Sequence, residues 1–101
     1  DGSKTLMIIK EVIQHLSLED GVAAITSARR SQARFLAITN HDQKLFDVER
    51  NVDIETGAFY PNNVLLPPFN LRNPIADIAE DLPENLQASY GNLMIFDLYE
   101  N

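Results

Sequence analysis

Four of the five prolines in this 101-residue chain lie between positions 61 and 74. Proline lacks a backbone N–H and has a fixed φ, so a central β-strand cannot run through the segment TGAFYPNNVLLPPFNLRNP, residues 56–74. The same segment holds seven large apolar side chains, which are too many for a solvated linker. We therefore expect an ordered loop over residues 56–73, with a short strand at 64–66, that packs on the domain or on a partner.

The residues before this loop carry periodic patterns. Apolar residues recur at helical spacing over residues 4–16, which predicts an amphipathic helix. A helix start is indicated by SLED, residues 17–20, because a serine with an acid three residues later can satisfy free amide groups. For residues 18–34 we favour a continuing helix, and a hairpin is the alternative because Gly21 and Thr26 also suit a turn and a strand.

Strands are predicted on both sides of the loop. One is indicated by RFLAIT, residues 34–39, and a half-buried one by the alternating residues 45–55. Between them, NHDQ, residues 40–43, is typical of a turn. After the loop, Asn73 and Pro74 predict the start of a short acidic helix over residues 74–82. The last strand is predicted at LMIFDLY, residues 93–99, near the middle of the sheet.

These elements predict an α+β fold, with one or two N-terminal helices packed on an antiparallel sheet of about four or five strands and a short acidic helix before the last strand. Residues 4–101 are expected to form a single domain. The first three residues, DGS, are interpreted as the remnant of an expression tag or the cut edge of a longer protein.

Composition restricts the possible functions. The chain has no cysteine, which excludes disulfides, thiolate metal sites and a thiol nucleophile. No apolar run is long enough to cross a bilayer, so we expect a soluble chain whose compartment stays undetermined. The net charge is −7, and residues 51–101 hold eight acids against the single base Arg72. Nucleic-acid binding is therefore not expected, whereas a basic partner would be attracted.

Two groups of polar residues could carry chemistry. His41, beside Asp42, has no metal-ligand or catalytic spacing to His15, so we interpret it as part of a turn and expect no metal, no cofactor and no catalytic residue. A group of arginines could bind an anion or a partner's carboxylate, because guanidinium groups offer paired donors. This group comprises Arg29, Arg30 and Arg34.

Two further groups could form contact surfaces. Acidic residues crowd the short helix predicted over residues 74–82 and its exit, and we interpret them as a solvated face that could dock a basic partner: Asp77, Glu80, Asp81 and Glu84. Apolar side chains on the proline-rich loop offer large contact area with little entropy left to lose. We expect them either to cover the core or to form the partner or ligand surface: Phe59, Tyr60, Leu65 and Phe69.

Together these patterns favour a non-enzymatic binding or interaction module, such as the sensory or regulatory domain of a larger protein, that recognises a protein partner or a small apolar ligand. One alternative is a stand-alone acidic inhibitor of a basic target, such as an immunity protein or a nucleic-acid mimic. A second alternative is a small hydrolase or transferase that uses His41.

Overall fold

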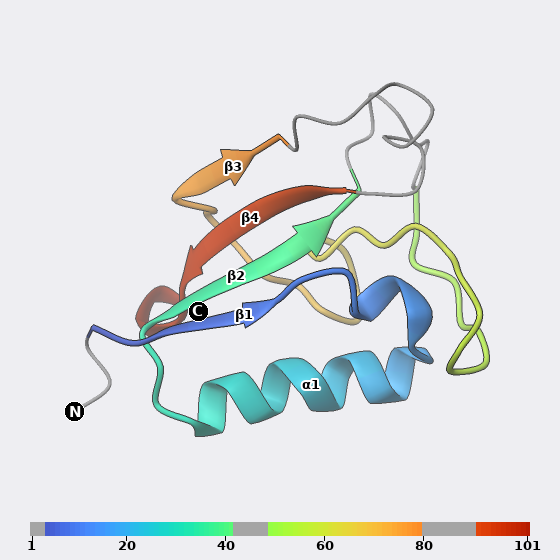
Figure 1. Cartoon of the computed structure of the whole chain (residues 1–101), viewed down its shortest axis with the longest axis horizontal. Helices are drawn as coiled ribbons and strands as arrows, with labels where there is room; N and C mark the ends of the chain where they lie inside the picture. Colours follow the sequence, from blue (N-terminus) through green and yellow to red (C-terminus); the bar gives the residue numbers. More distant parts are fainter. Residues whose placement is uncertain (1–3, 42–48, 80–90) are drawn as a thin grey trace.

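The computed structural model describes residues 4–41, 49–79 and 91–101 (Figure 1). Among these residues, one α-helix stands between the first and second strands, and two more strands follow. The elements are β1 (Leu6–Ile9), the 3-10 helix η1 (Ile13–His15), α1 (Leu18–Arg30), β2 (Phe35–Asn40), β3 (Ala76–Ile78), β4 (Asn92–Asp97) and the 3-10 helix η2 (Leu98–Glu100). The predicted α+β class is thus confirmed, with one α-helix and a four-stranded sheet in the described residues.

The sheet has the strand order β1-β2-β4-β3 (Figure 1). β1 and β2 run parallel, with Leu6 opposite Phe35, whereas β4 is antiparallel to both β2 and β3. A parallel pair needs a long crossover connection, which α1 supplies between β1 and β2. The predicted antiparallel sheet is therefore correct for β2, β4 and β3 and wrong for β1. The reason is that α1 carries the chain back along the sheet, so that β2 starts at the same end as β1 and runs parallel to it.

The predicted helix over residues 4–16 is also wrong. Leu6–Ile9 form β1, Glu11 has a φ of 58° that no α-helix contains, and only one 3-10 turn follows. The Glu11 N–H donates to Thr39 Oγ1 on β2 at 2.7 Å, which holds the bend. Four consecutive apolar residues fit a strand of a parallel sheet as well as a buried helix turn, and pairing with β2 decides between them.

The helix start predicted at Ser17 is confirmed. Ser17 Oγ accepts from the Asp20 N–H at 3.1 Å, and the Leu18 N–H donates to Asp53 Oδ1 at 2.9 Å. These bonds satisfy amide groups that have no partner within the helix. α1 then continues to Arg30, so the favoured helix within residues 18–34 is confirmed and the hairpin alternative is excluded. The strands predicted at 34–39 and 93–99 correspond to β2 and β4.

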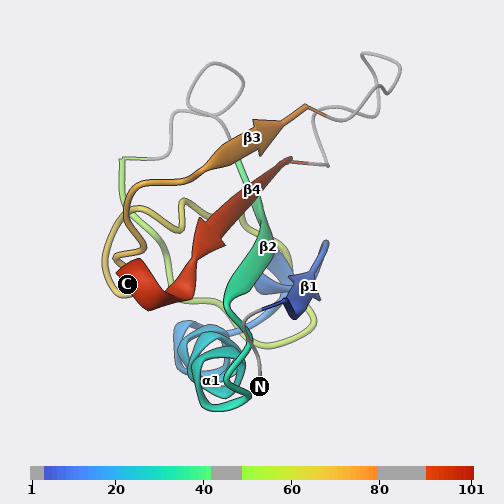
Figure 2. The same cartoon turned by 90° about the vertical axis from the view of Figure 1, so that its left-hand side faces the viewer.

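One face of the sheet carries the core. α1 and the loop before β3 lie on the same side of β2 and β4 (Figure 2). The buried apolar residues of this layer are Ile13, Ile25, Ala28, Leu36, Ile38, Val64, Phe69, Leu71, Met94, Phe96 and Leu98. The loop thus supplies three core side chains, which explains its apolar content.

The ordered loop over residues 56–73 is confirmed, without the predicted strand at 64–66. Side-chain bonds hold the loop instead: Asn51 Nδ2 donates to the carbonyls of Asn63 and Pro67, and the Val64 N–H donates to Asn40 Oδ1. Residues 49–55 form no strand, and residues 45–48 of that prediction lie outside the described residues, as do residues 42 and 43 of the predicted turn.

The acidic helix predicted over residues 74–82 does not begin at Pro74. Ala76–Ile78 pair with β4 as β3, and the Ile75 N–H donates to the Ile95 carbonyl at 2.7 Å. Strand pairing with a distant segment thus replaces the local helix signal at Asn73 and Pro74. Residues 80–82 lie outside the described residues. Within the parts of the chain that the structure describes, no helix has the length and apolarity required to span a bilayer.

Candidate functional site

A tight turn at Pro67–Phe69 brings the proline-rich loop against α1. The N–H groups of Phe69 and Asn70 both donate to the Leu66 carbonyl at 3.1 Å, and the Leu71 N–H donates to the Val64 carbonyl at 2.9 Å. This turn directs the Phe69 ring to Gly21 of α1, where an added Cβ would lie 3.0 Å from Phe69 Cε1. Gly21 therefore allows the ring to approach the helix closely.

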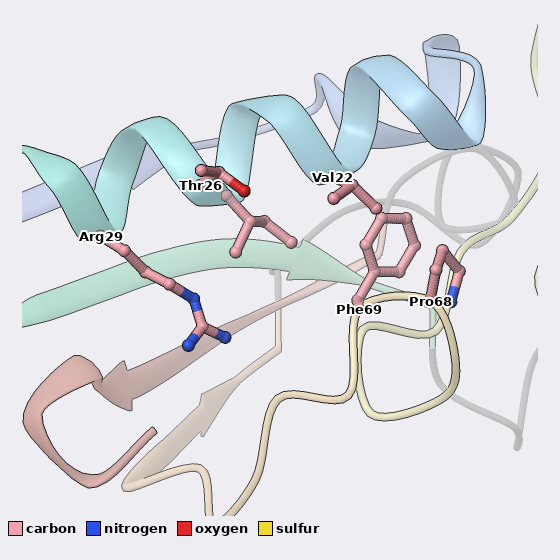
Figure 3. Close-up of a pocket in the computed structure, with 6 residues that line it drawn as sticks. Val22, Thr26, Arg29, Pro68 and Phe69 are labelled. Atoms are coloured by element: carbon pink, nitrogen blue, oxygen red, sulfur yellow. The ribbon is translucent and has the colours of Figure 1, made fainter.

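A pocket of about 160 Å³ lies between this turn and α1 (Figure 3). Four of its six lining residues have apolar side chains, and a hydroxyl and a guanidinium stand among them. We call it the α1 pocket, and it is lined by Val22, Ile25, Thr26, Arg29, Pro68 and Phe69. The volume suits one side chain or a small ligand, since pockets for drug-sized ligands measure about 300–1,000 Å³.

Arg29 gives the α1 pocket its charge. Its side chain leaves the last turn of α1 on the side of the helix where Val22 and Phe69 lie (Figure 3), and Nη1 donates to the Asn101 main-chain oxygen at 2.7 Å. This bond orients the guanidinium, which has five N–H donors in total. An apolar wall beside an oriented guanidinium suits a ligand that combines an apolar group with a carboxylate.

The structure separates the three arginines predicted as one contact. Arg29 lines the α1 pocket, and Arg30 is exposed without lining it. Arg34 donates to Asp97 Oδ2 through Nε at 3.2 Å and Nη2 at 3.1 Å, and its guanidinium lies over the rings of Phe35 and Tyr99. The hydrogen bonds from Arg34 lower the pKa of the Asp97 carboxyl, and Asp97 raises the pKa of Arg34.

The predicted loop surface is also divided. Phe59, Tyr60 and Leu65 are exposed, whereas Phe69 is only 6% exposed and belongs to the core and to the pocket wall. The Phe59 ring instead contacts His15 and His41, at centroid distances of 5.7 and 6.0 Å. The loop therefore has a buried half facing α1 and an exposed half around Phe59.

His41 follows β2 and is fully buried. Its ring Nδ1 accepts from the Asn62 backbone N–H at 3.1 Å, and the His41 backbone N–H donates to the Asn62 carbonyl at 2.9 Å. The Asn62 side chain donates through Nδ2 to the Thr39 carbonyl at 3.0 Å. His15 Nδ1 lies 2.9 Å from the Ala58 carbonyl and donates to it. Both histidines thus tie the N-terminal part of the domain to the loop.

Among the predicted acidic residues, Asp77 is exposed on β3, and Glu80, Asp81 and Glu84 lie outside the described residues. In the described ranges, no three His, Asp or Glu side chains come together in a way that could hold a metal ion. The predicted acidic face is therefore represented here by Asp77.

Sequence reasoning did not predict three of the residues that line the α1 pocket and come from the helix itself. Val22, Ile25 and Thr26, with Arg29, stand at positions i, i+3, i+4 and i+7 of α1, a spacing that places them on one face. That spacing was a usable signal once the helix was assigned.

No protein-family model, curated protein or solved structure matches this chain.

Proposed function

We propose that this chain is a non-enzymatic binding module whose α1 pocket accepts an apolar side chain of a protein partner and whose Arg29 contacts a carboxylate next to it. The observation that carries the proposal is the meeting of Phe69 and Arg29 around one pocket, although 40 residues separate them in the sequence. A pocket of about 160 Å³ has room for one side chain, which a protein segment would supply.

The contacts around the pocket support binding rather than turnover. Its walls are apolar except for Thr26 and Arg29, and neither is a general base at neutral pH. The alternative that uses His41 for catalysis has less support, because the ring is fully buried and its Nδ1 is occupied by the Asn62 amide. A catalytic imidazole must reach the proton that it transfers.

The test uses 3-phenylpropionate as a minimal probe, with 3-phenylpropionamide as its neutral counterpart, followed by NMR of the labelled chain. We expect the carboxylate to bind in the millimolar range and to shift the signals of Val22, Thr26 and Phe69. Arg29→Gln should weaken binding about three- to tenfold, which corresponds to about 0.7–1.4 kcal/mol, the usual net contribution of one hydrogen bond. Arg30→Gln is the matched control, because Arg30 is exposed on the same helix and does not line the pocket.

A second matched pair tests the cavity itself. Thr26→Leu should fill the pocket and abolish probe binding, whereas Ala23→Leu, at an exposed position of α1 outside the pocket, should leave it unchanged. Equal binding of the acid and the amide would show that Arg29 does not contact the carboxylate. NMR signal shifts confined to residues outside the pocket, or no shifts at all, would contradict the proposal.

The acidic-inhibitor alternative makes a different prediction. An inhibitor that uses the carboxylates of residues 51–101 would bind a basic target with an affinity that falls steeply with salt. Binding through an apolar pocket with one guanidinium depends only weakly on salt. The salt dependence of partner binding therefore separates the two functions.

A further inference from the structure

The guanidinium of Arg29 keeps a pair of donors for a ligand. Its hydrogen bond within the described residues runs from Nη1 to the Asn101 main-chain oxygen at 2.7 Å. A guanidinium carries five N–H donors in a fixed plane. Nε and Nη2 lie side by side on one edge of that plane, an arrangement that matches a carboxylate. Arg34 uses the same two nitrogens to bind the Asp97 carboxylate, at 3.2 and 3.1 Å.

The α1 pocket has an apolar floor and a rim that is open to solvent. Ile25 and Phe69 are only 4% and 6% exposed and form the floor. Val22, Arg29 and Pro68 are exposed and form the rim (Figure 3). An apolar cavity of about 150 Å³ can hold a benzene ring. The α1 pocket, at about 160 Å³, therefore has room for one phenyl group or one branched aliphatic side chain.

The apolar group and the carboxylate must lie close together in the ligand, because Phe69 and Arg29 line a pocket with room for one ring. In an extended peptide, neighbouring side chains point to opposite sides, and the next one on the same side is about 7 Å away. On a helix, the nearest side chains are three or four residues apart, with about 5–6 Å between their Cβ atoms. A carboxylate on another residue therefore lies further from the pocket than one on the residue that fills it.

One residue of a polypeptide carries a side chain and a carboxylate on the same Cα atom, and this is the C-terminal residue. Its chain continues in one direction only, so the rest of the partner can leave the pocket across the exposed rim at Val22 and Pro68. Its terminal carboxylate carries one negative charge, and Arg29 is the one charged side chain among the six that line the pocket. Capture of a C-terminal carboxylate is a recurring mode of peptide recognition.

We propose that the α1 pocket binds the C-terminus of a partner polypeptide that ends in phenylalanine or leucine. The terminal side chain fills the floor formed by Ile25 and Phe69, and Nε and Nη2 of Arg29 bind the terminal carboxylate. This inference rests on the proposed function. It narrows the partner from any segment with a carboxylate next to an apolar side chain to the free end of a chain.

The test compares three acetylated tetrapeptides by NMR titration of the labelled chain. The first has the sequence Gly-Ser-Gly-Phe and a free terminal carboxylate, and the second is the same peptide with a terminal amide. The third, Gly-Ser-Asp-Phe with a terminal amide, has the same charge as the first but carries its carboxylate on the neighbouring residue. We expect the free acid to bind about tenfold more tightly than either amide and to shift the signals of Val22, Thr26 and Phe69.

Variants of the native chain locate the carboxylate. Arg29→Gln removes the paired donors, so the free acid and its amide should bind to this variant within about twofold of each other. Arg29→Lys keeps the charge without the pair, and we expect a preference between those of Arg29→Gln and the native chain. Arg30→Gln is the matched control, since Arg30 is exposed outside the pocket, and it should keep the tenfold preference. A tenfold preference that persists in Arg29→Gln would contradict the proposal.

The three peptides also decide the question on the native chain alone, so the test does not depend on the folding of any variant. Equal binding of the free acid and the aspartate peptide would overturn this inference and leave the proposed function in place, because both peptides combine a phenyl group with a carboxylate. Binding of 3-phenylpropionate, which has the carbon skeleton of phenylalanine, without binding of the free-acid peptide would also overturn it. The proposed function fails separately, through the absence of any pocket shift with 3-phenylpropionate.

Discussion

At the scale of single residues, polar side chains connect segments that lie far apart in the sequence. Arg34 and Asp97 are 63 positions apart, yet they join the start of β2 to the end of β4. Asp97 also accepts from the Tyr99 N–H through Oδ1 at 3.0 Å, so both of its oxygens have a partner. Bonds that favour the ionised form of a carboxyl lower its pKa, which agrees with the direction found for Asp97.

This pKa shift predicts how stability depends on pH. Because the pKa of Asp97 is lower in the folded chain than its usual 3.8, its contribution to the unfolding free energy is present above that value and is lost as the pH falls through the folded pKa. We expect Asp97→Asn to destabilise the chain at pH 7 and to reduce the further loss of stability below about pH 4. Urea unfolding between pH 2.5 and 7 measures both effects.

Asp77→Asn is the matched control, since Asp77 is an exposed carboxylate on the neighbouring edge strand. Its unfolding free energy should fall on acidification as much as that of the native chain. If Asp97→Asn lost stability on acidification as steeply as this control, the ion pair with Arg34 would not be the cause.

At the scale of elements, the start of α1 illustrates how local and distant contacts combine. The cap at Ser17 is encoded within four residues, whereas two further bonds come from the start of the loop and the residues just before it: Asp53 accepts from the Leu18 N–H, and Thr56 Oγ1 accepts from the Ser17 N–H. Thr56 also donates to Asp20 Oδ2 at 2.6 Å. The helix start is therefore also the place where the loop is anchored.

Removal of the cap should weaken the helix by a predictable amount. Ser17→Ala leaves the Asp20 N–H without the serine oxygen, and we expect a loss of about 1 kcal/mol in the unfolding free energy. Ser27→Ala, at an exposed interior position of α1, is the control and should change stability by less than about 0.5 kcal/mol. Chemical denaturation of both variants measures the difference. Equal losses would mean that serine replacement anywhere in α1, rather than the cap, is responsible.

At the scale of the whole molecule, charge and apolar surface are distributed unevenly. The acidic excess belongs to residues 51–101, whereas bases balance acids in residues 1–50. The α1 pocket carries a cationic side chain from the balanced half, Arg29. The proposed contact therefore suits an acidic partner segment, although the chain as a whole is acidic.

The net charge of −7 predicts that salt stabilises the native chain. Self-repulsion among the acids opposes the folded state, and added ions screen it. We expect the melting temperature to rise by about 2–4 °C between 20 and 200 mM NaCl, which is a change of about 0.5 kcal/mol in a chain of this size. Thermal unfolding followed by circular dichroism measures the shift. A fall in melting temperature would show that ion pairs such as Arg34–Asp97 outweigh the repulsion.

The sequence by itself determined the features that depend on neighbouring residues. The cap at Ser17, the strands β2 and β4 and the irregular course of the proline-rich loop all follow from capping, β-propensity and missing N–H groups within short segments. Those signals act over a few residues, and the tertiary structure does not override them here.

Only the tertiary structure decided which segments pair. LMII is a strand because β2 lies beside it, residues 76–78 are a strand because β4 does, and Phe69 is buried because α1 presents Gly21 to its ring. The same contacts bring Arg29 to Phe69 and separate it from Arg34. The physical reason is that pairing and burial are interactions between residues far apart in the chain, and no local pattern contains the partner.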